Sequence, residues 1–231
     1  MNNGWFCILN KINRFTFEKG IYSFINPYSF LLLENKMELS DKVDFWLVDG
    51  ISLVNYLNKN LNLNISRHSF DETSLAPLIF NYAKQLNLKI AIIGTKKDVI
   101  DEAVANISSR HSINIEYSRN GYFNNSAERE ECYSVIINRG IELVICGMGT
   151  PFQESFLIGL KEKGWNGYGF TCGGYLHQIS KKVDYYPKFV DTYNLRWVYR
   201  IYDEPRLIKR YFFYYPLFFL KFGKFLRRLK K

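Results

Sequence analysis

One acidic residue of the sequence lies where a catalytic base is expected. Asp49 follows the apolar run Phe-Trp-Leu-Val and precedes Gly50, which permits a sharp turn. A carboxylate at the carboxyl end of a strand lies at the mouth of a parallel sheet, where it can accept a proton from a substrate hydroxyl. The same pattern fits a helix cap in front of the helix expected from Ile51, and the local sequence leaves both interpretations open.

Two glycine-containing turns are candidates for a nucleotide pocket. Gly94-Thr95 follows one apolar run, and Gly147-Met148-Gly149-Thr150 follows another. Helix N-termini placed after such turns offer backbone N–H groups to phosphates. We expect Thr95 and Thr150 to cap the helices that begin there. The complete dinucleotide fingerprint, with its third glycine, is absent from both turns.

Other polar residues lie near expected strand ends. Asn26 follows the first strand, and its position before Pro27 favours a helix cap over a binding role. Arg67 has the fork geometry to bind a diphosphate, although taken alone it also fits a surface arginine. Gln153 and Glu154 open a helix after the second glycine turn, where a side chain can reach a sugar or ribose hydroxyl or complete a capping box.

Short β-branched or aromatic runs alternate with longer amphipathic stretches, and together they predict the elements that position these residues. The expected strands are Ile21–Ile25, Val43–Val48, Lys89–Ile93, Asn114–Tyr117, Glu142–Cys146 and Gly167–Thr171. The expected helices are Pro27–Leu39, Ile51–Leu61, Asp71–Leu86, Lys96–Arg110, Ser126–Arg139 and Pro151–Lys163. This rhythm predicts a Rossmann-like α/β fold, a largely parallel sheet flanked by helices. The 231 residues suffice for one such domain.

The net charge of the chain is concentrated in its C-terminal segment. Residues 196–231 contain 11 basic and 2 acidic residues, whereas the rest of the chain contains 20 of each sign. The segment from Tyr211 to Leu220 is uncharged and rich in aromatics, but it is shorter than the about 20 residues needed to span a bilayer as a helix. We therefore expect the tail to lie on an anionic membrane surface and not to bind nucleic acid. The alternative is that the aromatics pack on the domain and the lysines are solvated.

Cysteine and histidine spacing argues against disulfides and metal sites. The four cysteines are Cys7, Cys132, Cys146 and Cys172, and the three histidines are His68, His111 and His177. Neither set has the spacing of a zinc site, and no Asp-x-Asp element occurs. The N-terminus lacks a basic-then-apolar signal segment, so we expect free thiols in a reducing cytoplasm. We expect no cofactor and no protein-held metal.

Taken together and in order, several motifs resemble those of the WecG/TagA/CpsF glycosyltransferases, glycosyltransferase family 26. The resemblance rests on Asp49-Gly50-Ile51-Ser52, Ser66-Arg67, Gly121-Tyr122-Phe123, Gly147 to Glu154, Gly173-Gly174, Leu195 to Arg200, and Glu204-Pro205-Arg206 through Arg210. It covers roughly residues 20–210. The Gly-x-Pro-x-Gln-Glu and Trp-x-Tyr-Arg blocks are its most specific parts.

The resemblance implies a reaction and several residue roles. Members of the family transfer N-acetylmannosamine, its uronic acid or another hexose from a UDP-sugar to a sugar linked to undecaprenyl diphosphate, with inversion. Asp49 matches the proposed catalytic base of the family. Asn26, Arg67 and Gln153 match pocket positions.

By the same resemblance, the C-terminal segment holds the enzyme on the membrane and supplies arginines to the active site. Arg200 and Arg210 fall on two of these arginine positions. The third position is Leu207, so Arg206 beside it is the candidate substitute. His177 stands where the family has an acidic residue near the donor.

We therefore predict an inverting, metal-independent glycosyltransferase that moves a hexose or an N-acetylhexosamine of the N-acetylmannosamine type, in bacterial cell-surface polysaccharide or teichoic acid synthesis. Residues 1–194 would form the catalytic domain, and residues 195–231 a helical appendage that docks on the membrane and closes the site. The protein would be peripheral at the cytoplasmic face of the cell membrane, with a homo-oligomer left open. The predicted substrate-binding residues are Asn26, Arg67, Gly94, Tyr122, Gly147, Gly149, Gln153, Glu154, Gly174, His177, Arg200, Arg206 and Arg210.

The predicted mechanism is a single in-line displacement in which Asp49 takes the proton of the acceptor hydroxyl. Arginines and helix N-termini would neutralise the departing diphosphate in place of a metal. Two other interpretations remain open at this point. One is a noncatalytic membrane-surface adaptor, and the other is another nucleotide-dependent α/β enzyme, such as an oxidoreductase.

Overall fold

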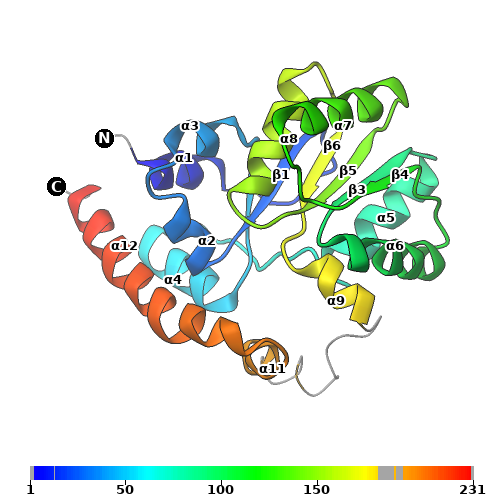
Figure 1. Cartoon of the computed structure of the whole chain (residues 1–231). Helices are drawn as coiled ribbons and strands as arrows, with labels where there is room; N and C mark the ends of the chain where they lie inside the picture. Colours follow the sequence, from blue (N-terminus) through cyan, green and yellow to red (C-terminus); the bar gives the residue numbers. More distant parts are fainter. Residues whose placement is uncertain (1–2, 13, 182–189, 191–194, 230–231) are drawn as a thin grey trace.

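The computed structural model describes residues 3–12, 14–181, 190 and 195–229. Its single sheet has the strand order β2-β1-β6-β5-β3-β4, and every neighbouring pair is parallel. The strands are β1 (Gly20–Ile25), β2 (Phe45–Val48), β3 (Ile90–Gly94), β4 (Tyr117–Arg119), β5 (Leu143–Gly147) and β6 (Tyr168–Thr171). Helices cover both faces of the sheet (Figure 1), so the predicted α/β fold class is confirmed.

Each face of the sheet has its own apolar layer. Alternate strand residues point to opposite faces, as with Ile21 on one face and Tyr22 on the other. One layer contains side chains from α1 (Gly4–Lys11), α2 (Pro27–Leu32), α3 (Met37–Lys42), α4 (Ile51–Leu61), α7 (Ser126–Asn138), α8 (Phe152–Glu162) and α12 (Tyr215–Leu229). The other contains side chains from α5 (Leu75–Gln85), α6 (Lys97–His111) and α9 (Tyr175–Lys181). Burial on both faces explains why the central strands β3 and β5 are apolar throughout.

The strand order reverses in the middle of the sheet. From β1 the chain goes to β2 at one edge and then crosses to β3 and β4 at the other. The carboxyl ends of β1, β6 and β5 therefore lie at the reversal, where open α/β sheets bind ligands.

Several predicted elements differ from the structure. The predicted helix Pro27–Leu39 is two helices, because the backbone N–H of Gly4 donates to the carbonyl of Glu34 at 2.9 Å and the N-terminal segment packs into the break. The predicted strand Asn114–Tyr117 lies three residues later, as β4. The two predicted threonine caps are wrong. The cap positions belong to Lys96 and Pro151, and neither makes a side-chain capping bond.

The C-terminal segment follows the body of the protein in two parts. Helix α11 (Arg196–Asp203), a 3₁₀ turn (Pro205–Leu207) and a π-helical turn (Arg210–Tyr214) precede α12, which runs along the outside of the body in Figure 1. Phe218, Phe222 and Phe225 of α12 are buried in the core layer. Among the described residues, no helix combines the length and the apolar character needed to cross a membrane.

Candidate active site

The predicted site residues lie along the carboxyl edge of the sheet, in the order of the strands. Asp49 follows β2 and Asn26 follows β1, and the backbone N–H of Asp49 donates to the carbonyl of Ile25 at 2.7 Å. Asn26 caps α2 by accepting from the N–H groups of Tyr28 and Ser29, at 3.0 and 3.1 Å. The capping role favoured for Asn26 is therefore confirmed, and its amide oxygen is engaged in the cap.

Asp49 does not cap the helix after it. The cap position of α4 is Gly50, with no side-chain bond. Instead, Oδ1 of Asp49 accepts from Arg67, 3.0 Å from Nη2 and 3.2 Å from Nε. About a third of the Asp49 side chain, 35%, stays exposed. The capping alternative is therefore wrong, and the carboxylate is held by an arginine with room left for a ligand.

The environment of Asp49 adjusts its proton affinity. Burial has the largest effect and raises the pKa of this carboxyl above its usual value. The cations of Arg67 and Arg200 act in the opposite direction, while the neighbouring carboxylate of Asp71 adds to the increase. A carboxylate with a raised pKa is a stronger base, so the site suits proton abstraction from a hydroxyl.

Arg67 connects Asp49 to further charged groups. Its Nη2 donates to Ser69 Oγ at 2.9 Å and lies 3.5 Å from Oδ2 of Asp71. The same Oδ2 lies 2.9 Å from Nη1 of Arg196, at the start of α11. A line of alternating charges thus runs from the end of β2 to the C-terminal segment. Neither Asp71 nor Arg196 was predicted as a site residue, although the spacing from Arg67 to Asp71 is that of an i,i+4 ion pair.

The two glycine turns lie side by side. A Cβ on Gly94 would come within 2.5 Å of the carbonyl oxygen of Gly147, so only glycine fits between these neighbouring strands. Gln153 Oε1 accepts from the N–H of Gly149 at 3.2 Å and from that of Gly173 at 3.3 Å. Gln153 is buried, so its role in this structure is to join the turns after β5 and β6.

Glu154 is fully buried beneath the same turns. Its Oε1 accepts from Ser23 at 2.8 Å, from Thr150 at 3.0 Å and from Gln153 at 3.1 Å. Its Oε2 has no hydrogen-bond partner within the described part of the chain. Burial raises the pKa of Glu154, against the hydrogen bonds from Ser23, Gln153 and Thr150 that act in the opposite direction. Glu154 thus joins the end of the turn after β5 to β1 through buried hydrogen bonds.

Helix α11 brings Arg200 to the turn after β6. A Cβ on Gly174 would lie 3.0 Å from Arg200 Nη2, so this glycine leaves room for the guanidinium. Glu204, which is largely buried, lies 3.6 Å from Arg200 Nη2 and 2.6 Å from Arg206 Nη2. Arg206 is mostly exposed and Leu207 is buried. The structure thus places Arg200 over the sheet edge and Arg206 at the surface.

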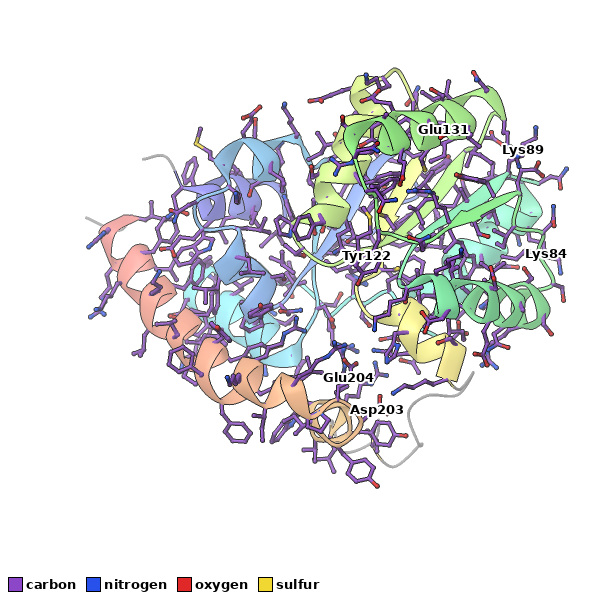
Figure 2. All side chains as sticks on the ribbon, in the orientation of Figure 1. Lys84, Lys89, Tyr122, Glu131, Asp203 and Glu204 are labelled. Carbon is purple, nitrogen blue, oxygen red and sulfur yellow. The ribbon has the colours of Figure 1, made fainter. Side chains whose placement is uncertain are left out.

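One group of described residues has the geometry to hold a metal ion. His177, Asp203 and Glu204 offer ligand atoms within 4.8 Å of one another, a grouping that sequence spacing did not reveal. Cations already bind both carboxylates, because Lys181 lies 2.9 Å from Asp203 and Arg206 lies 2.6 Å from Glu204. A metal ion would have to displace these ion pairs. Figure 2 shows Asp203 and Glu204 beside α11, away from Tyr122.

Arg210 and two tyrosines complete the side of the site near α2. The Arg210 guanidinium lies 4.2 Å from the ring centre of Tyr28. Burial lowers the pKa of Arg210, and the nearby cation of Arg200 acts in the same direction. Tyr211 and Tyr215 lie near enough to Asp49 for its charge to raise their pKa values, after the larger effect of burial. Two neighbouring cations favour an anionic ligand, and the sequence analysis did not identify the tyrosines as site residues.

Tyr122 lies in the loop after β4. It is mostly exposed and lines an open depression of about 610 Å³ with Lys97, Arg119 and Asn120. The N–H of its neighbour Gly121 donates to the carbonyl of Thr95 at 3.0 Å, so the loop folds back to the turn after β3. The structure thus places Tyr122 beside the Gly94-Thr95 turn, whereas Asp49 follows β2.

Comparisons with known proteins identify the family of the chain and a relative. A family model described as "Glycosyl transferase WecG/TagA/CpsF family" matches residues 7–231. A curated protein of Shigella boydii, a UDP-Gal:alpha-D-GlcNAc-diphosphoundecaprenol beta-1,4-galactosyltransferase, is 37% identical over 216 residues. The match covers 92% of this chain and 90% of the Shigella protein.

Proposed function

The chain belongs to the WecG/TagA/CpsF family of glycosyltransferases, and from this we propose that it transfers a hexose or N-acetylhexosamine from a UDP-sugar to a sugar linked to undecaprenyl diphosphate. The name of the Shigella relative makes UDP-galactose the first donor to test and N-acetylglucosamine the first acceptor sugar. A donor of the N-acetylmannosamine type is the second choice. The product would enter a cell-surface polysaccharide or teichoic acid. The observation that carries the proposal is the pair of Asp49 and Arg67 beside the cations of the C-terminal segment.

In the proposed reaction, the acceptor hydroxyl attacks the anomeric carbon from the face opposite to UDP. Asp49 takes the hydroxyl proton as the new C–O bond forms and the bond from the anomeric carbon to the diphosphate breaks, which inverts the anomeric centre. Arg67 orients the carboxylate through Oδ1 and leaves its second oxygen for the acceptor. The raised pKa of Asp49 strengthens the base.

The departing diphosphate would be neutralised by protein cations. Arg200 and Arg210 lie near each other, and their mutual repulsion is relieved by an anion between them. The positive end of the α8 dipole, after Gly149, adds to this field. This account requires no metal. EDTA should therefore leave turnover unchanged, and a loss that Mg²⁺ or Mn²⁺ restores would contradict this account.

The C-terminal segment is proposed to hold the enzyme on the cytoplasmic face of the cell membrane. Phe212, Phe213 and Leu220 are well exposed, and the basic residues of α12 lie along the same segment. Apolar side chains beside basic ones suit an anionic lipid surface. Residues 195–231 would thus act as the appendage that docks and closes the site over residues 1–194.

The test is product analysis with a panel of UDP-sugars and an undecaprenyl-diphosphate-linked acceptor. We expect UDP release together with a mass increase of one sugar on the acceptor. The matched variant is Asp49→Asn, which keeps the size of the side chain and should reduce turnover about 100- to 10,000-fold by removing the base. UDP release without a glycosylated acceptor, or full turnover by a folded Asp49→Asn protein, would contradict the proposal.

A further inference from the structure

The carboxylate of Asp71 joins two parts of the protein that are far apart in sequence. Its Oδ2 lies 3.5 Å from Arg67 Nη2, in the loop after α4, and 2.9 Å from Arg196 Nη1, at the start of α11. Arg196 also donates to the Thr73 hydroxyl. One oxygen atom is thus shared by the arginine that holds Asp49 and by an arginine of the C-terminal segment.

Asp71 itself is firmly placed. Its Oδ1 accepts from the Thr73 N–H at 2.9 Å and from the Thr73 hydroxyl at 2.7 Å, while its Oδ2 accepts from Ser69 at 2.5 Å. The side chain is only 13% exposed. Burial by itself raises the pKa of Asp71, but the cation of Arg196 and these hydrogen bonds outweigh it, so the pKa is lowered and Asp71 stays ionised.

The position of α11 on the protein depends on ion pairs of this kind. No residue of α11 is fully buried, and the Trp197 ring packs on that of Tyr211 within the same C-terminal segment, 6.0 Å between ring centres. Ion pairs at its two ends join Arg196 to Asp71 and Asp203 to Lys181. Arg200, which acts on Asp49, lies between these two ends.

We propose that Asp71 is a positioning residue that couples the seating of α11 to the pair of Asp49 and Arg67, by sharing one oxygen between Arg67 and Arg196. With α11 seated, Arg196 compensates the charge of Asp71, and Arg67 is left to Asp49. When α11 is detached, Asp71 keeps its contact with Arg67 but loses the one with Arg196. The negative charge of Asp71 is then less compensated and opposes ionisation of Asp49. The base is therefore ready when the cations of the C-terminal segment are in place over the donor. This inference rests on the proposed function, because it takes Asp49 as the base.

The groups that face Asp49 determine what a pH profile can show. Arg67 and Arg200 favour its ionised form, and Asp71 opposes it. Tyr211 and Tyr215 also face it, and both have raised pKa values, so they stay neutral across the relevant range. His68 lies next to Arg67, and burial followed by that cation lowers its pKa, so it is neutral at pH 7. The ionised groups that shift the acid limb of the pH profile are therefore the Asp71 carboxylate and the arginines Arg67 and Arg200.

The first experiment measures how firmly α11 is attached to the protein and needs no assay of activity. Amide hydrogen exchange is followed in the full chain for Arg196→Gln, Asp71→Asn and the double variant. We expect each single change to speed exchange of α11 amides by at least about fivefold, and the double change to add nothing beyond them. Lys181→Gln is the matched control. It releases the other end of α11 and should speed exchange additively with Arg196→Gln.

The second experiment compares the acid limbs of kcat at saturating donor and acceptor, where α11 is held closed by the diphosphate. Arg196→Gln removes the cation that compensates Asp71, so its acid limb should move to higher pH by roughly one unit. Asp71→Asn removes the opposing anion, so its acid limb should move to lower pH. Lys181→Gln should leave the limb in place. At pH 7, kcat/KM should fall about 5- to 150-fold in Arg196→Gln.

The outcomes separate this inference from the proposed function. Opposite shifts of the two acid limbs, with non-additive exchange, support the coupling. Additive exchange effects, shifts in the same direction, or an unchanged limb in Arg196→Gln would overturn it while Asp49→Asn still lacks activity. If no UDP-sugar is used at all, the proposed function fails, and the exchange experiment still decides whether Asp71 links Arg67 to α11.

Discussion

Two neighbouring helices of the C-terminal segment are attached to the protein in different ways. Helix α12 buries Phe218, Phe222, Phe225 and Leu226, and the Phe222 ring lies 5.3 Å from the ring of Trp5. Helix α11 buries none of its residues and is held through charged side chains, including Arg196 and Asp203. Apolar burial resists salt and pH, whereas partly exposed ion pairs are weak and are screened by salt.

The two helices therefore have different roles: α12 stabilises the fold, and α11 carries an arginine of the active site. Because α12 shares the core layer of the sheet, its loss would cost folding free energy. Helix α11 carries Arg200 and is attached by polar contacts, so little free energy is needed to detach it. When it is attached, it brings a cation to Asp49. The comparison also shows that truncation after Arg210 is a poor test of membrane docking, since it removes buried core residues together with the exposed ones.

The largest expected effect is on stability, from Phe222→Ala in α12. Loss of this buried ring should lower the free energy of unfolding by about 3–5 kcal/mol. Urea unfolding followed by tryptophan fluorescence measures it. Leu220→Ala, on the exposed side of the same helix, is the control and should change stability by no more than about 0.5 kcal/mol. Equal losses in both variants would show that α12 is not part of the core.

The next effect is on catalysis, from Arg200→Ala in α11. Removal of one charged donor to a developing anion typically lowers turnover about 100- to 1,000-fold. The free energy of unfolding should stay within about 1 kcal/mol of the wild-type value, because the ion pair of Arg200 with Glu204 is long, at 3.6 Å, and Arg200 stays partly exposed. Steady-state kinetics and urea unfolding on the same samples check both parts, with the exposed Lys209→Ala as control. Normal turnover in Arg200→Ala would place leaving-group stabilisation elsewhere.

A smaller effect is expected on membrane binding, from Phe212→Ser combined with Phe213→Ser. These rings are 68% and 61% exposed, and inserting a phenylalanine into an apolar layer is worth about 1.5–3 kcal/mol. Affinity for anionic vesicles in a sedimentation assay should therefore fall at least about tenfold while stability is unchanged. Leu86→Ser, an exposed position beyond α5, is the control. Unchanged vesicle binding in the double variant would remove the π-helical turn from the docking surface.

The smallest effect is the salt response of the two helices. Raising the salt concentration from about 0.05 to about 0.5 M screens partly exposed ion pairs worth about 0.2–1 kcal/mol each. Amide exchange in α11 should accelerate by up to about fivefold, and exchange in α12 should not change. Equal responses of α11 and α12 would mean that the two helices move as one unit, contrary to the comparison.

The apolar pattern of the sequence was sufficient for the fold class. Five of the six predicted strands overlap strands of the sheet over most of their length, because buried parallel strands read as continuous apolar runs. The sixth shares only Tyr117 with β4, a short edge strand that is not buried. The helix Ile51–Leu61 was predicted with its exact bounds. The single helix predicted over Pro27–Leu39 failed because a distant contact, from Gly4 to Glu34, decides where α2 ends.

The site was predictable only in part. Asp49 and Arg67 were named from their positions after apolar runs and from the resemblance to the family, but the sequence could not decide whether Asp49 caps a helix. The ion pair with Arg67 decides it. Likewise, Gln153 has the residue type of a ligand contact, and its place between the two turns makes it a buried bridge.

By itself, the sequence determined the order and type of the elements, the row of polar residues and glycines after the strands, and the basic aromatic tail. These are local properties of composition and spacing. Only the tertiary structure decided which aromatics of the tail are buried and which carboxylate meets Arg196, because both depend on how residues more than a hundred positions apart come together. Asp71 and Arg196 meet across such a separation, and no local pattern contains their contact.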